Sequence, residues 1–167
     1  MPLSRRTFLK ASAAAGAVTR PILGHASEWL SGPPWPTIKV GNVGQLETGK
    51  AVHFRYPDDQ SPAWLVKLEQ PAYGGVGPDK NVVAFSALCT HMGCTIGFTG
   101  GRFVCPCHKS MFDPAKNGQV YQGLATDYLP QILLSVDGAG DIHADGVDGL
   151  IWGRTDDLQF QKSSRKA

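Results

Sequence analysis

The 167-residue chain lacks the features that would assign it to several common classes of protein. Its charge is nearly balanced, with 16 Lys and Arg against 14 Asp and Glu, so no broad surface for nucleic acid is expected. No apolar run approaches the ~20 residues needed to span a bilayer, so we expect no stable membrane anchor. Internal repeats, coiled-coil heptads and a phosphate-binding P-loop are also missing. An apolar content of 42% instead predicts one domain with a substantial hydrophobic core.

Acidic residues are absent before Glu28, whereas four of the 16 basic residues precede it. Arg5 and Arg6 are followed by a weakly apolar, Ala-rich segment, which resembles a twin-arginine (Tat) export signal. The small residues Gly24 and Ala26 favour cleavage after Ala26, so residues 1–26 are expected to be removed. Tat moves folded proteins, which suits a cofactor inserted before export to the oxidising periplasm. The remaining chain is mildly acidic, which favours either a cationic protein partner or simply a solvated surface.

Helical patterns are scarce, and short β-like runs separated by Gly, Pro, Asn and Asp take their place. Many short strands at this spacing predict an antiparallel all-β domain. Residues 86–88 are the one candidate helical turn. The expected strands are Thr37–Val40, Ala51–Tyr56, Ala63–Leu68, Val82–Phe85, Arg102–Val104, Gly118–Tyr121, Gln131–Val136, Asp141–Ala144 and Leu150–Gly153.

All four cysteines and two of the five histidines lie in two short boxes, Cys89-Thr90-His91-Met92-Gly93-Cys94 and Cys105-Pro106-Cys107-His108. A structural zinc site would use four of these six groups, but its usual C-x2-C or H-x3-H spacing is absent. A four-cysteine iron–sulfur cluster would leave both histidines unused, and two disulfides would explain neither histidine. Two thiolates on one iron, two imidazoles on the other and one disulfide account for all six groups.

The two boxes resemble the signature of disulfide-containing Rieske proteins, which carry a [2Fe–2S] cluster. The resemblance implies one cluster per chain. Cys89 and Cys105 would bind the inner iron, and His91 and His108 would bind the outer iron through Nδ1. It also implies that Cys94 and Cys107 form a disulfide between the two cluster loops.

The same resemblance implies the fold and the domain limits. The fold would be all-β, with three stacked antiparallel sheets. A domain at 27–160 would contain a small cluster-binding subdomain at about 86–130, and a basic C-terminal tail would occupy 161–167.

Residues beside the second box are predicted to tune the cluster. Ser110 matches a position whose hydroxyl donates to a bridging sulfide in high-potential relatives and raises the potential; a plain turn serine is the alternative. Phe112 stands where respiratory-chain relatives commonly carry a tyrosine that bonds a ligand thiolate. Because Phe cannot donate, we expect an intermediate potential. Lys109 departs from the usual Gly, and Gly123–Pro130 resembles the third loop that covers the cluster.

The predicted chemistry is the transfer of single electrons. No nucleophile, activated base or open metal position is apparent in the sequence, so the chain is not expected to transform a substrate itself. Replacing two thiolates by neutral imidazoles makes the cluster less negative and therefore easier to reduce.

Beyond the boxes, the chain resembles the small subunit of arsenite oxidase, notably at Val83–Ser86, Ala125–Asp127 and Val147–Arg154. The resemblance implies that a molybdopterin-containing large subunit oxidises arsenite and passes electrons to this chain. A soluble periplasmic cytochrome c or cupredoxin would then accept them. The alternatives are the Rieske subunit of a related molybdoenzyme such as iodate reductase, a bc-type respiratory Rieske protein, a dioxygenase ferredoxin and a zinc-stabilised binding module.

Overall fold

Ten β-strands and two short 3-10 helices form residues 35–154, the part of the chain that the computed structural model describes. The predicted signal at 1–26 and the predicted tail at 161–167 lie outside the described residues. No helix within residues 35–154 is long and apolar enough to cross a membrane. The elements are β1 (Ile38–Asn42), η1 (Val43–Gln45), β2 (Ala51–Arg55), β3 (Pro62–Lys67), β4 (Val82–Ser86), β5 (Gly97–Thr99), β6 (Arg102–Val104), β7 (Met111–Asp113), η2 (Pro114–Lys116), β8 (Gln119–Gln122), β9 (Gln131–Val136) and β10 (Asp141–Asp148).

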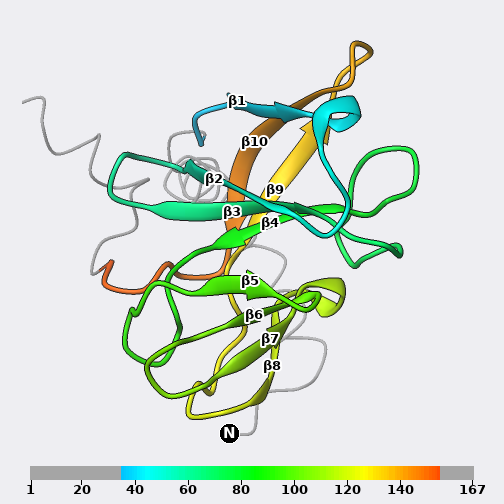
Figure 1. The fold of residues 1–167 in the computed structure, drawn as a ribbon. Coiled ribbons are helices and arrows are strands. Elements are labelled where there is room, and N and C mark those ends of the chain that lie inside the picture. Colours follow the sequence, from blue (N-terminus) through cyan, green and yellow to red (C-terminus); the bar gives the residue numbers. More distant parts are fainter. Residues whose placement is uncertain (1–34, 155–167) are drawn as a thin grey trace, which may run out of the picture. The chain divides into compact units, whose positions relative to one another are not determined.

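The strands pair into two antiparallel sheets, which confirms the predicted fold class (Figure 1). One sheet has the order β1-β10-β9-β4-β3-β2, and the other has the order β5-β6-β7-β8. The prediction of three sheets is wrong for residues 35–154, because β4 pairs with β9 and joins two three-stranded halves. These halves still face each other, since a Cβ placed on Gly41 of β1 would lie 3.1 Å from Leu65 of β3.

The central strand β4 is buried on both faces and separates two hydrophobic clusters. Because side chains alternate along a strand, Val83 and Phe85 join one cluster while Val82 and Ala84 join the other. The second cluster fills the inside of the folded six-stranded sheet. The first lies between that sheet and the four-stranded one, and it contains both free cysteines of the boxes. The residues of β4 that face the first cluster therefore pack in the same cluster as the two free cysteines.

Most predicted strands are confirmed, but several local predictions fail. Residues 150–153 form no strand; they follow Gly149, whose φ of 103° lies in the left-handed region that strands avoid. Residues 86–88 form no helical turn, since Leu88 pairs with Thr95 in an isolated bridge. The three-residue strands β5 and β7 were not predicted, and β10 continues four residues beyond its predicted end.

Candidate metal centre

The two boxes lie on the two connections that lead into and across the small sheet. The first box joins β4 to β5, and the second joins β6 to β7. In each box the N–H of the first cysteine donates to the carbonyl five residues later, at 2.9 Å for Cys89 to Cys94 and 2.8 Å for Cys105 to Ser110. Each of these cysteines also accepts at its own carbonyl from the N–H four residues later. The boxes are therefore two copies of one loop conformation, although their sequences share few residues.

The fifth residue of each loop has a left-handed backbone. It is Gly93 in the first loop, with φ 71°, and in the second loop it is Lys109, the residue that follows the box, with φ 58°. This conformation costs a residue with a side chain about 1–2 kcal/mol. Gly adopts this backbone without that cost, so Lys109 holds the position at some cost in stability.

The sulfur and nitrogen donors are separated by depth. Cys89 and Cys105 are free thiols, 0% and 1% exposed, within the first hydrophobic cluster. His91 is half-buried and His108 is exposed. The Nδ1 atoms of these two histidines face each other at 3.2 Å, with their ring centroids 4.8 Å apart. The thiols thus lie on the core side of the centre and the imidazoles on its solvent side.

This donor set fits a mixed thiolate–imidazole iron–sulfur cluster. Two imidazole nitrogens 3.2 Å apart can both reach one metal at about 2.0–2.1 Å, as nitrogen ligands do in tetrahedral sites. On the core side, burial raises the pKa of the Cys89 thiol, and the neighbouring Cys105 adds to the rise. A bound metal would have to displace this proton, so metal binding and thiol ionisation are linked.

A disulfide joins Cys94 to Cys107 and so ties the two boxes together. The Sγ atoms of these two residues and of Cys105 all lie within 4.8 Å of one another. Two of the three sulfurs are already bonded to each other, so this group offers one free donor, Cys105. The pairing agrees with the one that the sequence resemblance implied.

Ser110 is fully buried, and its hydroxyl oxygen accepts from two backbone N–H groups, Leu124 at 3.1 Å and Ala125 at 3.0 Å. A hydroxyl has two lone pairs and one hydrogen. With both lone pairs occupied, its hydrogen remains free to donate to another acceptor. Gly123, with φ 93°, permits this contact, because a Cβ there would lie 2.3 Å from the Ser110 Cα.

Phe112 is fully buried in β7 and belongs to the same hydrophobic cluster as Cys89 and Cys105. Its ring has no polar atom to offer a cysteine sulfur. The predicted lack of a hydrogen-bond donor at this position therefore follows directly from its side chain and its surroundings.

Two contacts of the first box were not predicted. Thr90 Oγ1 donates to the carbonyl of Asp127 at 2.8 Å, which ties the box to the 123–130 loop. Trp152 packs against Gly93, where a Cβ would lie 2.2 Å from its indole Cδ1. Such long-range contacts leave no local signal, although Trp152 lies in the 147–154 stretch that carries the wider resemblance.

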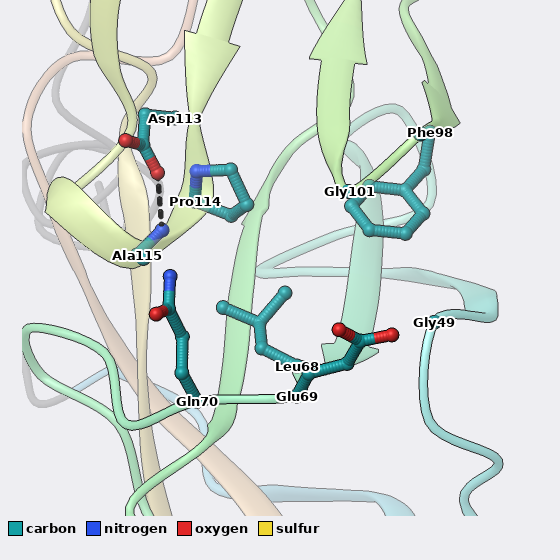
Figure 2. Close-up of a pocket in the computed structure, with 10 residues that line it drawn as sticks. Gly49, Leu68, Glu69, Gln70, Phe98, Gly101, Asp113, Pro114 and Ala115 are labelled. Carbon is teal, nitrogen blue, oxygen red and sulfur yellow. Dashed lines mark hydrogen bonds between the residues drawn. The ribbon is translucent and has the colours of Figure 1, made fainter.

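A cavity of about 540 Å³ lies at a different place (Figure 2). It is bounded by the segment after β3, the β5–β6 turn and the start of η2. Because β5 leaves the first box and ends at that turn, the cavity lies at the opposite end of the small sheet from the boxes. Its Asp113 carboxylate accepts from the Ala115 N–H at 2.9 Å and caps η2. Asp113 thus serves local structure, and the cavity is separate from the metal centre.

Comparison with known proteins identifies two segments. Residues 37–132 match the Rieske [2Fe-2S] domain, and residues 2–19 match the TAT (twin-arginine translocation) pathway signal sequence. The signal indicates export to the periplasm.

Similar whole proteins include two bacterial subunits. The chain is 41% identical over 158 residues to iodate reductase subunit IdrB of Denitromonas iodatirespirans, covering 90% of this chain and 84% of that protein. It is 42% identical over 123 residues to iodate reductase subunit IdrB of Pseudomonas sp. strain SCT, covering 69% and 62%. Among solved structures, the soluble domain of Rieske protein II (soxF) from Sulfolobus acidocaldarius matches with a TM-score of 0.61 and 26% identity, covering 72% of this chain and 82% of that chain.

Proposed function

The chain belongs to the Rieske [2Fe-2S] family, and we propose that it is the electron-transfer subunit of a periplasmic molybdopterin oxidoreductase. The observation that supports this most is the depth ordering of the donors, with two buried thiols and two solvent-side imidazoles. We propose Cys89 and Cys105 as ligands of the inner iron and His91 and His108 as ligands of the outer iron. When bound, the cluster supplies a one-electron couple of higher potential than an all-thiolate cluster.

The residues of the chain set the surroundings of that couple. Water does not reach the core side of the centre, because both thiols are buried there. On the solvent side the ring of His108 is exposed, so a partner protein can come close to it. Ser110 is proposed to direct its free hydrogen at a cluster sulfur, because its lone pairs are already occupied. Phe112 provides no second donor. The cluster would then accept one tuning hydrogen bond, whereas high-potential relatives have two. This difference supports an intermediate reduction potential.

The loops that carry the centre also expose large apolar side chains. Met92 lies in the first box, Leu124 and Tyr128 in the 123–130 loop, and Leu150 and Trp152 in the C-terminal stretch, each 42–70% exposed. Exposed apolar residues that gather on neighbouring loops are typical of protein-binding surfaces. They support the docking of a protein partner at the imidazole end of the domain.

We propose an iodate-reducing large subunit as the partner, because two similar proteins are iodate reductase subunits and one of them matches 90% of the chain. Electrons would then flow from a soluble cytochrome c or cupredoxin through this chain to the large subunit. An arsenite-oxidising large subunit is the second candidate, supported by the resemblance at 147–154. In that case the electrons would flow in the opposite direction.

Purification with the large subunit tests this function. The chain should co-purify with a molybdopterin oxidoreductase encoded beside it, and the complex should oxidise a reduced dye when iodate is added. Arsenite-dependent dye reduction without iodate activity would favour the second candidate. Co-purification with a cytochrome b, and with no molybdoenzyme, would contradict both.

A further inference from the structure

Cys105 lies beside the disulfide as a free thiol. Its Sγ is within 4.8 Å of the Sγ atoms of both Cys94 and Cys107. Cys105 is 1% exposed, so reagents in solution reach it poorly. The two disulfide sulfurs, in contrast, are already close to its Sγ atom. Three sulfurs this close allow thiol–disulfide exchange within the chain.

The direction of exchange follows from the spacing along the chain. Cys105 and Cys107 are separated by one residue, so a bond between them would close a very small and strained ring. Attack by the Cys105 sulfur on the Cys94 sulfur avoids this problem. The Cys94–Cys105 bond forms, the Cys94–Cys107 bond breaks, and the proton lost by Cys105 ends on the Cys107 sulfur. The step needs no oxidant or reductant.

We propose that the cluster, by occupying Cys105, protects the Cys94–Cys107 disulfide from this internal exchange, so that the cluster must be loaded before the disulfide closes. The inference rests on the proposed ligand role of Cys105. A chain that oxidises without its cluster would lose Cys105 to a Cys94–Cys105 bond and would no longer bind iron. Export through the Tat pathway fits this order, because the reducing cytoplasm keeps Cys94 and Cys107 as thiols until the folded protein reaches the periplasm.

Peptide mapping of the full-length protein tests the proposal. Loaded protein and protein stripped by an iron chelator are incubated without thiol reagents, quenched in acid, alkylated and digested for mass spectrometry. In the stripped protein, the Cys94–Cys105 peptide should appear within minutes to hours and Cys107 should become alkylated. In the loaded protein, exchange should be slower by about tenfold or more, because the attacking sulfur is bound.

Two single variants provide matched controls, since each removes one proposed ligand thiol. Neither variant should bind the cluster, so neither needs stripping. Cys105→Ser protein should keep the Cys94–Cys107 bond, whereas Cys89→Ser protein should show the Cys94–Cys105 bond as stripped wild-type protein does. Rapid loss of the Cys94–Cys107 bond in Cys105→Ser protein would overturn the proposal, because the exchange would then not require the Cys105 sulfur. Retention of Cys94–Cys107 in stripped wild-type protein, to the same extent as in Cys105→Ser protein, would also overturn it.

A reloading measurement separates this inference from the proposed function. Stripped wild-type protein aged without reductant should take up less iron and sulfide than freshly stripped protein, and a thiol reductant should restore the uptake. Equal uptake before and after ageing would refute the protective role, while the electron-transfer assay with the large subunit would be unaffected. Iron binding by Cys105→Ser protein would instead refute the ligand assignment.

Discussion

Gly123 sets the distance between the 123–130 loop and the second box, and its replacement by Ala perturbs that contact most directly. An added Cβ would lie 2.3 Å from Ser110 Cα, 2.6 Å from Ser110 N and 2.7 Å from Ser110 Oγ. Two of these atoms belong to the backbone and cannot rotate away. The loop would therefore have to move, and the two N–H groups that hold the Ser110 hydroxyl would move with it.

The expected loss of stability has two parts. A left-handed φ of 93° costs Ala about 1–2 kcal/mol, and forcing a methyl group into an occupied space costs about 1–3 kcal/mol more. Gly101→Ala is the matched control, because Gly101 has a similar φ of 76° but nothing within 4 Å of its Cβ position. The Gly123 variant should thus be less stable than the Gly101 variant by about 1–3 kcal/mol.

Guanidinium unfolding of the loaded protein, followed by circular dichroism, measures this difference, and voltammetry measures the reduction potential. We expect Gly123→Ala to lower the potential, since it displaces the Ser110 hydroxyl, and Gly101→Ala to leave it unchanged. Equal stabilities and equal potentials in the two variants would refute the view that close contact at Gly123 positions Ser110.

Three further predictions concern the centre and the sheet. Phe112→Tyr should raise the reduction potential by placing a hydroxyl beside the cysteines, whereas Phe98→Tyr, near the distal cavity, should not; a voltammetric comparison without an upward shift for Tyr at 112 would reject the tuning assignment. Cys94→Ser combined with Cys107→Ser should leave the cluster loaded but reduce unfolding stability by about 3 kcal/mol, from the short loop that the disulfide closes; complete loss of iron would mean that ligand and disulfide roles are exchanged. Hydrogen bonds from Asn42 and Lys39 lower the pKa of Asp141, so its carboxylate adds stability at neutral pH that is lost as the pH falls through that lowered pKa. Asp141→Asn should therefore lose less stability than wild type on acidification in urea-unfolding curves.

The sequence predicts the long strands and the two boxes because each has a strong local pattern. The runs that became β4 and β9 are rich in β-branched and apolar residues bounded by turn residues. In contrast, β5 and β7 are three residues each, too short for alternation to show, and their pairing depends on neighbouring strands. Residues 150–153 have apolar character but lie after a glycine with a left-handed backbone, which local composition does not indicate.

The sequence predicts the four candidate ligands, and the structure places the two histidines side by side and buries the two cysteines, but the contacts that support them were not predicted. The spacing of Cys and His specifies a ligand set because those side chains serve few other purposes at that density. The shared conformation of the two loops could not be predicted from the sequence. It depends on backbone hydrogen bonds and on a left-handed residue that is Gly93 in one loop and Lys109 in the other. The packing of Trp152 on Gly93 and the Thr90 bond to Asp127 join segments far apart in sequence, so only the folded chain reveals them.

We propose that one iron of the cluster is bound by two histidines of this chain, His91 and His108. Pulsed electron paramagnetic resonance of the reduced protein tests it directly, with all histidines labelled with ¹⁵N. We expect couplings from two imidazole nitrogens, which change from the ¹⁴N to the ¹⁵N pattern on labelling. A His108→Cys variant that keeps its iron should show the coupling of one imidazole nitrogen only. A reduced cluster without any histidine nitrogen coupling would contradict it.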